Sequence, residues 1–193
     1  MKQRYIFFLV ISFLVSCESK KTVEIKQIDS KEMVTILPNI KRLNDSIPIC
    51  IPLEFEIKIN SPIHYINWFY SENNKFLENG FDYLVYNKED KTKSVYQLGF
   101  DGPFNEKRVT IILKGRNHLI SKKDALELLK KYDIIKSQDN LKFEDTIKLI
   151  TYDKFRTQNH LLINNLNKIN DSIKIRGMKK DGRFFYESKK INW

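Results

Sequence analysis

The feature that most constrains the fold of this chain is a run of alternating apolar and polar residues at positions 53–60. Its apolar members are Leu53, Phe55, Ile57 and Ile59. Because successive side chains of a strand point to opposite faces, this period of two predicts a strand that is buried on one face. Further runs with strand character follow at residues 64–70, 81–86, 94–100 and 108–114. Strands at such regular spacing, separated by Asn-Gly, charged and Gly-Pro turns, predict an antiparallel sheet or sandwich.

The pattern becomes helical after residue 120. Ser121 stands three residues before Asp124, a spacing similar to a capping box with Asp in place of Glu. Apolar residues then recur at intervals of three and four, which predicts a helix over residues 122–131. Residues 146–152 predict another strand, and residues 153–169 predict a second helix with one apolar side.

The last part of the chain predicts a β-hairpin around the two-residue turn Asp181-Gly182. That turn places Arg176 opposite Glu187 as a cross-strand ion pair. The opposite, inward face of the hairpin would then consist of Ile173, Ile175, Phe184 and Tyr186. The whole pattern predicts an α+β fold, mainly an antiparallel β-sheet or sandwich of about six to eight strands, with two helices in the C-terminal half and a C-terminal β-hairpin.

The first seventeen residues indicate where the protein goes. Lys2 and Arg4 precede an apolar run at residues 5–15, which is shorter than the about 20 residues of a membrane-spanning helix and is typical of a secretion signal. The segment Leu14-Val15-Ser16-Cys17 resembles the lipobox of bacterial lipoproteins. That resemblance implies cleavage before Cys17 and acylation of Cys17, which would tether the mature chain to a membrane. The alternative is an ordinary secretory signal in which Cys17 stands by chance.

Three segments follow from this interpretation. Residues 1–16 are a lipoprotein signal peptide, residues 17–45 an acylated tether, and residues 46–193 a single α+β domain. Within the tether, residues 34–37 could already form a strand. Lys20 and Lys21 lie next to the acylated residue, where each would add attraction to an anionic leaflet.

The charge of the chain favours anionic partners. Lys and Arg number 34 against 24 Asp and Glu, a formal net charge of +10 that falls to about +8 once Lys2 and Arg4 leave with the signal. Outside the cytoplasm there is little nucleic acid, so we expect lipid head groups, an anionic polymer or an envelope protein rather than DNA or RNA. The alternative interpretation is a solvated surface in a chain rich in Lys, Asn and Ile.

Catalytic motifs are missing from the sequence. It contains no zinc-protease or nucleophile-elbow motif and no phosphate-binding glycine loop, so we expect no cofactor and no metal. Cys50 lies between Ile49 and Ile51, and we expect a buried thiol rather than a nucleophile. The catalytic alternatives are a dyad of Cys50 with His64, or His118 with Asp82 or Asp101, while His160 completes the three dispersed histidines.

Two groups of residues are candidates for binding. Aromatic side chains within residues 65–104 could offer flat contact surfaces, or they could form the core; the ones to test for exposure are Trp68, Tyr70 and Tyr86. The basic side chains of the C-terminal hairpin could contact an anionic partner, or they could be a solvated surface; they include Arg176, Lys179, Lys180 and Arg183.

These observations predict a lipid-anchored cell-envelope protein that acts as a binding module, with no catalytic residues. It would be attached to a bacterial membrane through acylated Cys17 and would face the periplasm or the cell surface. One alternative is a small envelope hydrolase that uses Cys50 or a histidine. Another is a protective, immunity-type lipoprotein that blocks a toxin or enzyme at the membrane.

Overall fold

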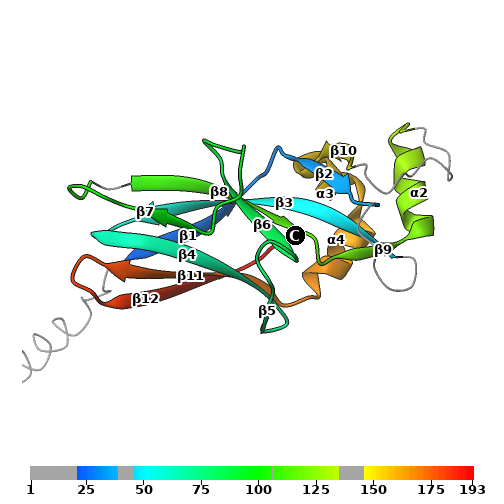
Figure 1. Cartoon of the computed structure of the whole chain (residues 1–193). Coiled ribbons are helices and arrows are strands. Elements are labelled where there is room, and N and C mark those ends of the chain that lie inside the picture. Colours follow the sequence, from blue (N-terminus) through cyan, green and yellow to red (C-terminus); the bar gives the residue numbers. More distant parts are fainter. Residues whose placement is uncertain (1–20, 39–45, 106, 135–145) are drawn as a thin grey trace, which may run out of the picture.

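The structure, a computed structural model, describes residues 21–38, 46–105, 107–134 and 146–193. Two antiparallel sheets pack against each other, which confirms the predicted α+β class and its C-terminal hairpin (Figure 1). The strands of the first sheet are β1 (Val23–Ile28), β2 (Met33–Ile36), β3 (Ser46–Ile59), β6 (Tyr83–Asn87), β8 (Lys107–Gly115), β9 (Leu119–Ser121) and β10 (Ile147–Thr151). Those of the second are β4 (Ile63–Glu72), β5 (Lys75–Phe76), β7 (Gln97–Gly99), β11 (Asp171–Lys179) and β12 (Phe184–Lys190).

The long strand β3 organises the first sheet, as the alternating run predicts. It pairs with β8 over nine residues and also with β1, β2 and β9. One of the polar residues in the alternating run, Glu54, is only 2% exposed. Lys88 Nζ lies 2.6 Å from Glu54 Oε2, and the buried hydroxyl of Ser30 donates to Glu54 Oε1 at 3.1 Å. The buried carboxylate is therefore stabilised by an ion pair and a hydrogen bond.

The sheet begins earlier in the chain than the sequence predicts. β1 pairs with β3 in the register Val23 to Ile59, and β2 pairs with β3 and β10. Both strands lie within residues 17–45, which the sequence predicts as a tether, although the expected strand near residues 34–37 does correspond to β2. Burial of Val23, Val34 and Ile36 explains why this segment folds with the domain. Residues 21–38 of the predicted tether therefore belong to the domain, and residues 17–20 and 39–45 lie outside the described residues.

The predicted register of the C-terminal hairpin is wrong by one residue. Arg176 pairs with Tyr186, and Ile175 pairs with Glu187. In the loop, Lys179 N–H donates to the Arg183 carbonyl at 2.9 Å, and Gly182 alone has a positive φ, +85°. This is the geometry of a three-residue loop with a left-handed glycine, whereas the two-residue turn needs positive φ at both central positions.

The changed register exchanges the inward and outward faces of β12. Phe185 is buried, while Phe184 and Tyr186 face the solvent, because a shift of one residue exchanges the two faces of a strand. Phe185 lies opposite Gly177, where an added Cβ would overlap the Phe185 ring and would come 2.7 Å from the Tyr65 carbonyl oxygen. The aromatic ring thus occupies the space that a larger residue at 177 would need.

The described residues contain three helices, all in the C-terminal half. α2 (Lys122–Lys131) has the predicted bounds, and the Ser121 hydroxyl accepts from Asp124 N–H at 3.0 Å as its cap. The single helix expected at residues 153–169 is instead two helices, α3 (Tyr152–Gln158) and α4 (His160–Asn167). They meet at Asn159, whose φ of −127° and ψ of 50° break the helical path.

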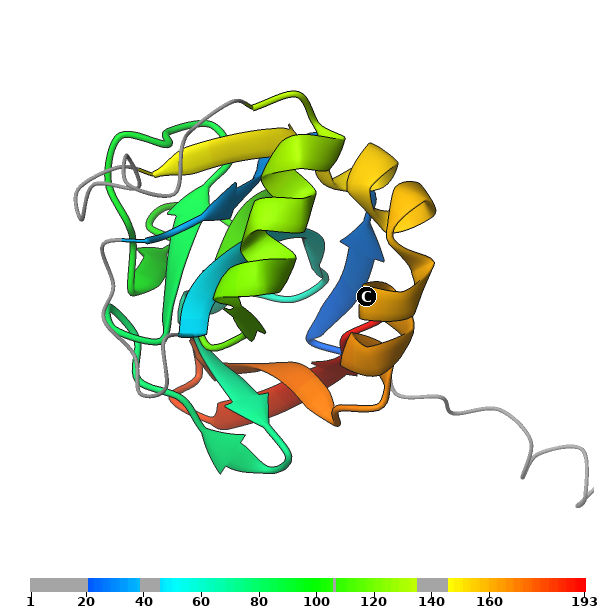
Figure 2. The ribbon, with the colours of Figure 1, turned by 90° about the vertical axis from the view of Figure 1, so that its right-hand side faces the viewer.

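The helices gather at one end of the sandwich, where α2 and the α3–α4 pair stand on either side of the strand ends (Figure 2). The C-terminal residue Trp193 is fully buried near this end, and its ring meets His118 edge to face at 4.7 Å between centroids. Where the chain is described, no helix combines the length and the apolar character needed to cross a membrane.

Candidate functional site

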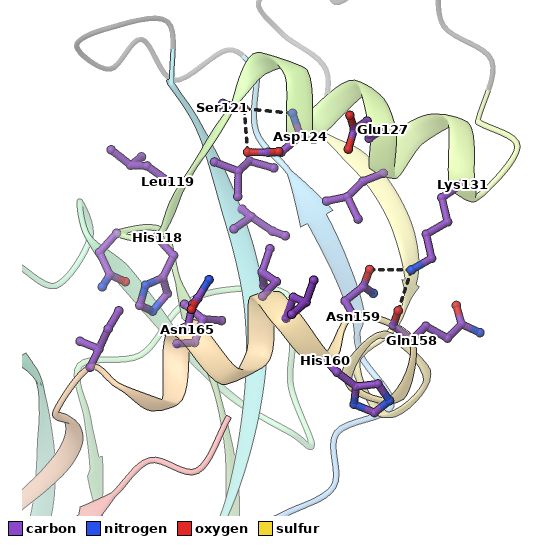
Figure 3. Close-up of a pocket in the computed structure, with 18 of the residues that line it drawn as sticks. His118, Leu119, Ser121, Asp124, Glu127, Lys131, Gln158, Asn159, His160 and Asn165 are labelled. Carbon is purple, nitrogen blue, oxygen red and sulfur yellow. Dashed lines mark hydrogen bonds between the residues drawn. The ribbon is translucent and has the colours of Figure 1, made fainter.

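A cleft opens between α2 and α4, at the helical end of the sandwich (Figure 3). It encloses about 960 Å³. Its apolar lining comes from the end of β3, from β9 and from both helices, and consists of Ile49, Leu119, Ile120, Leu128, Leu161, Leu162, Leu166 and Ile169. Leu161, at the cleft, is 84% exposed. Concave apolar surface of this size is typical of ligand and partner sites.

Polar contacts between the end of α2 and the junction of α3 with α4 fix one end of the cleft. Lys131 Nζ donates to the Gln158 carbonyl at 2.6 Å and to Asn159 Oδ1 at 2.9 Å (Figure 3). Asn159 Nδ2 in turn donates to the Tyr132 hydroxyl at 2.7 Å. The break between α3 and α4 is therefore held by the last turn of α2, which sets the separation of the two helices.

The charged rim of the cleft is acidic. The charged side chains that line it are Glu72, Asp124, Glu127 and Lys131. Lys131 donates to neutral acceptors and keeps its positive charge, and Glu127 Oε1 lies 3.9 Å from Lys123 Nζ, so the lining has only a small excess of negative charge. The cleft therefore suits a partner with apolar side chains and a few neutral or basic groups.

A buried polar cluster lies beneath the floor of the cleft. The Tyr70 hydroxyl donates to Asp171 Oδ2 at 3.0 Å and lies 3.1 Å from His118 Nε2. Because the hydroxyl has a single hydrogen, Nε2 must carry the proton and donate to the Tyr70 oxygen. His118 also lines the cleft, so this cluster connects the core with the site.

Burial shifts the pKa values of all three groups toward their neutral forms. It raises the pKa of Asp171 to about 6 and the pKa of Tyr70 far above its ordinary value, and it lowers the pKa of His118 to about 4. His118 is therefore a neutral imidazole at pH 7. Its Nε2 atom is occupied by a tyrosine hydroxyl that stays protonated, an arrangement suited to holding the floor in place and not to activating a nucleophile.

The residues of the catalytic alternatives lie in different environments. Cys50 is buried in β3 opposite Thr35, and burial raises the pKa of its thiol. His64 is exposed in β4, where its carbonyl accepts from Phe100. His118 Nε2 lies 3.5 Å from Asp171 Oδ2. His160 lies at the start of α4 and lines the cleft. Among the described residues, no group of three or more His, Cys, Asp or Glu is placed to hold a metal ion.

The predicted binding residues fall into different environments. Trp68 and Tyr70 are buried in the inner face of β4, so neither offers a ring to the solvent. Tyr86 is half-buried, with Lys114 Nζ 4.8 Å from its ring centroid. Lys179, Lys180 and Arg183 lie at the tip of the β11–β12 hairpin, at the opposite end of the molecule from the helices (Figure 1). Cys17 lies outside the described residues.

Arg176 belongs to a second surface, on the outer face of the five-stranded sheet. We call it the aromatic–basic face, and it consists of Phe69, Phe76, Lys174, Arg176, Phe184 and Tyr186. Arg176 Cζ lies 4.8 Å from the ring centroid of Phe184 and 5.9 Å from that of Tyr186, and Lys174 Nζ lies 4.7 Å from that of Phe76. Cations and rings thus alternate across neighbouring strands. A hollow of about 720 Å³ lies over most of this face.

Sequence reasoning missed parts of both sites. The cluster joins residues 48 and 101 positions apart, and no local spacing marks such a contact. The aromatic–basic face depends on the hairpin register, for which Gly177 was the available signal, since a strand glycine is often covered by an aromatic ring of the neighbouring strand.

No protein-family model, curated protein or solved structure matches this chain.

Proposed function

We propose that this chain is a lipid-anchored cell-envelope protein that binds a partner protein in the cleft between α2 and α4. The observation that carries the proposal is the cleft itself, an apolar hollow of about 960 Å³ with an acidic rim. A partner that inserts apolar side chains and presents basic groups would complement it. The lipid anchor remains the inference drawn from the lipobox-like residues that end at Cys17.

The positions of the cleft and of the first described residues support this arrangement. Asn60, just after β3, donates its backbone N–H to the Thr22 carbonyl, so the chain enters the fold beside the far end of that strand. Ile49, in the cleft, precedes Ile59 by ten residues of one strand, or about 33 Å at 3.3 Å per residue. An anchor attached before Lys21 therefore leaves the cleft open, well away from the point of attachment.

Site-specific photo-crosslinking in intact cells tests the cleft. A photoreactive phenylalanine at Leu161 should yield one reproducible adduct, because this side chain lies in the cleft and is exposed. The control position is Tyr96, which is 62% exposed but lies outside the cleft. The same adducts at both positions, or none at Leu161, would contradict binding in the cleft.

Fatty-acid labelling tests the anchor. Wild-type protein should incorporate labelled fatty acid and remain with the membrane fraction, and Cys17→Ala should lose the label. Absence of label from both forms, with equal membrane association, would show that the lipobox interpretation is wrong.

A further inference from the structure

The aromatic–basic face exposes large rings without a covering element in the described residues. Phe76 is 64% exposed and Tyr186 is 69% exposed, and Phe184 lies beside Tyr186 across Arg176. Exposed aromatic side chains lower the stability of the folded chain, and a contiguous patch of them is typical of a surface that binds a partner. Because each ring lies beside a cation, the chemistry of that partner can be inferred.

The charges of this face favour an anionic partner. Lys174 and Arg176 lie in strand β11, flanked by rings on β12 and β5. The acidic side chain that lines the hollow is Glu187, and Lys21 Nζ neutralises it at 3.1 Å from Oε2. Aromatic rings beside Lys and Arg are the side chains that proteins place at the headgroup level of bilayers, where an apolar ring and a charged tip are both accommodated.

The chain itself brings this face to a membrane. Lys21 lines the hollow, and the predicted acylation site Cys17 precedes it by four residues. Four residues span at most about 14 Å when fully extended. Acyl chains on Cys17 would therefore hold the edge of the aromatic–basic face within about 14 Å of the lipid surface, where even a weak surface interaction becomes effectively intramolecular.

We propose that the aromatic–basic face lies on the surface of an anionic phospholipid bilayer. The rings of Phe76, Phe184 and Tyr186 rest at the headgroup level, and Lys174 and Arg176 contact lipid phosphates. This inference rests on the proposed lipid anchor for its geometry, but the face has its own affinity for lipid. It assigns the membrane and the partner protein to different parts of the molecule.

The first experiment measures that affinity without the natural anchor. The unacylated chain of residues 17–193, which contains every described residue, is sedimented with phosphatidylglycerol–phosphatidylcholine vesicles in 0.15 M salt. Lys174→Gln/Arg176→Gln should lower the partition coefficient roughly twenty-five-fold, about fivefold for each basic residue. The control Lys123→Gln/Lys130→Gln makes the same charge change on α2 and should alter partition less than twofold, because charges far from the contact are screened at this salt concentration.

The second experiment locates the contact. Cys17 is coupled to a maleimide lipid, so that every molecule is tethered, and Tyr186→Trp is compared with Leu161→Trp in vesicles that contain brominated lipid. The native Trp68 and Trp193 are buried and give a common background. Tyr186→Trp should be quenched and shifted to the blue, and Leu161→Trp, at the cleft, should not.

Three results would overturn the proposal. The first is an equal loss of partition in the two charge variants. The second is equal partition to vesicles of phosphatidylcholine alone. The third is a Tyr186→Trp reporter that brominated lipid quenches no more than Leu161→Trp, which would leave the face free for a protein partner. Since neither experiment uses natural acylation, a failure here is distinct from a failure of fatty-acid labelling in cells.

Discussion

Replacing Asp171 by Asn should change how the stability of this protein depends on pH. Burial raises the pKa of Asp171 in the folded chain to about 6, against an ordinary value of 3.8. Between these values the folded chain holds a proton that the unfolded chain has lost, so this group lowers the free energy of unfolding as the pH rises. The difference between the two pKa values corresponds to about 3 kcal/mol of unfolding free energy.

His118 acts in the opposite direction over nearly the same pH range. Burial lowers its pKa to about 4, against an ordinary value of 6.5. Between these values the unfolded chain binds a proton that the folded chain does not, so this group raises the free energy of unfolding as the pH rises, again by about 3 kcal/mol. In the wild-type protein the two contributions should largely cancel between pH 4 and pH 6.5.

Urea unfolding at a series of pH values separates them. The free energy of unfolding of Asp171→Asn, relative to wild type, should increase by roughly 2 to 3 kcal/mol from pH 4 to pH 7, and that of His118→Gln should decrease by roughly the same amount. The difference curves remove the contribution of all other carboxylates, and the Asn oxygen still accepts from Tyr70. A flat curve for Asp171→Asn would refute the reasoning, and an opposite slope would show that the carboxylate is paired with a charged His118.

Three further predictions concern stability and reactivity. Gly177→Ala should destabilise the protein by about 1 to 3 kcal/mol in urea unfolding, because a ring and a carbonyl occupy the space for its Cβ, whereas Gly99→Ala in β7, which has open space, should be nearly neutral. Lys88→Met should cost about 3 kcal/mol in thermal or urea unfolding because it leaves the Glu54 carboxylate buried without its cation, and a loss below 1 kcal/mol would show that the pair is not needed. Cys50, in a Cys17→Ser chain, should react with a thiol reagent only upon unfolding, and rapid labelling of the native protein would reopen the nucleophile hypothesis.

Local signals predicted the elements whose stability is local. The bounds of α2 follow from the Ser121 cap and from apolar residues at helical spacing, both within one segment. The run at residues 53–60 predicted the inward side chains of β3 for the same reason. The break at Asn159 was missed because its stabilising partners, Lys131 and Tyr132, come from another helix.

The hairpin shows why a correct turn motif can still predict the wrong faces. Asp181-Gly182 fits both a two-residue turn and a three-residue loop with a left-handed glycine, and the sequence of the turn does not decide between them. The structure selects the second because Phe185 then covers Gly177. Side chains that the first register buries, those of Phe184 and Tyr186, become exposed rings of the aromatic–basic face.

The cleft and the aromatic–basic face differ in charge, and this difference bears on which of them contacts the membrane. The lining of the cleft carries three carboxylates and one lysine, and α2 beside it also carries Lys122, Lys123 and Lys130, so the cleft has no strong charge of either sign. The aromatic–basic face carries two cations between rings, and its one lining carboxylate is neutralised by Lys21. A protein held by lipid within about 14 Å of Lys21 would therefore settle with this face, and not the cleft, against the membrane. The cleft, about 33 Å along β3 from the point where the chain enters the fold, would then stay open to a partner.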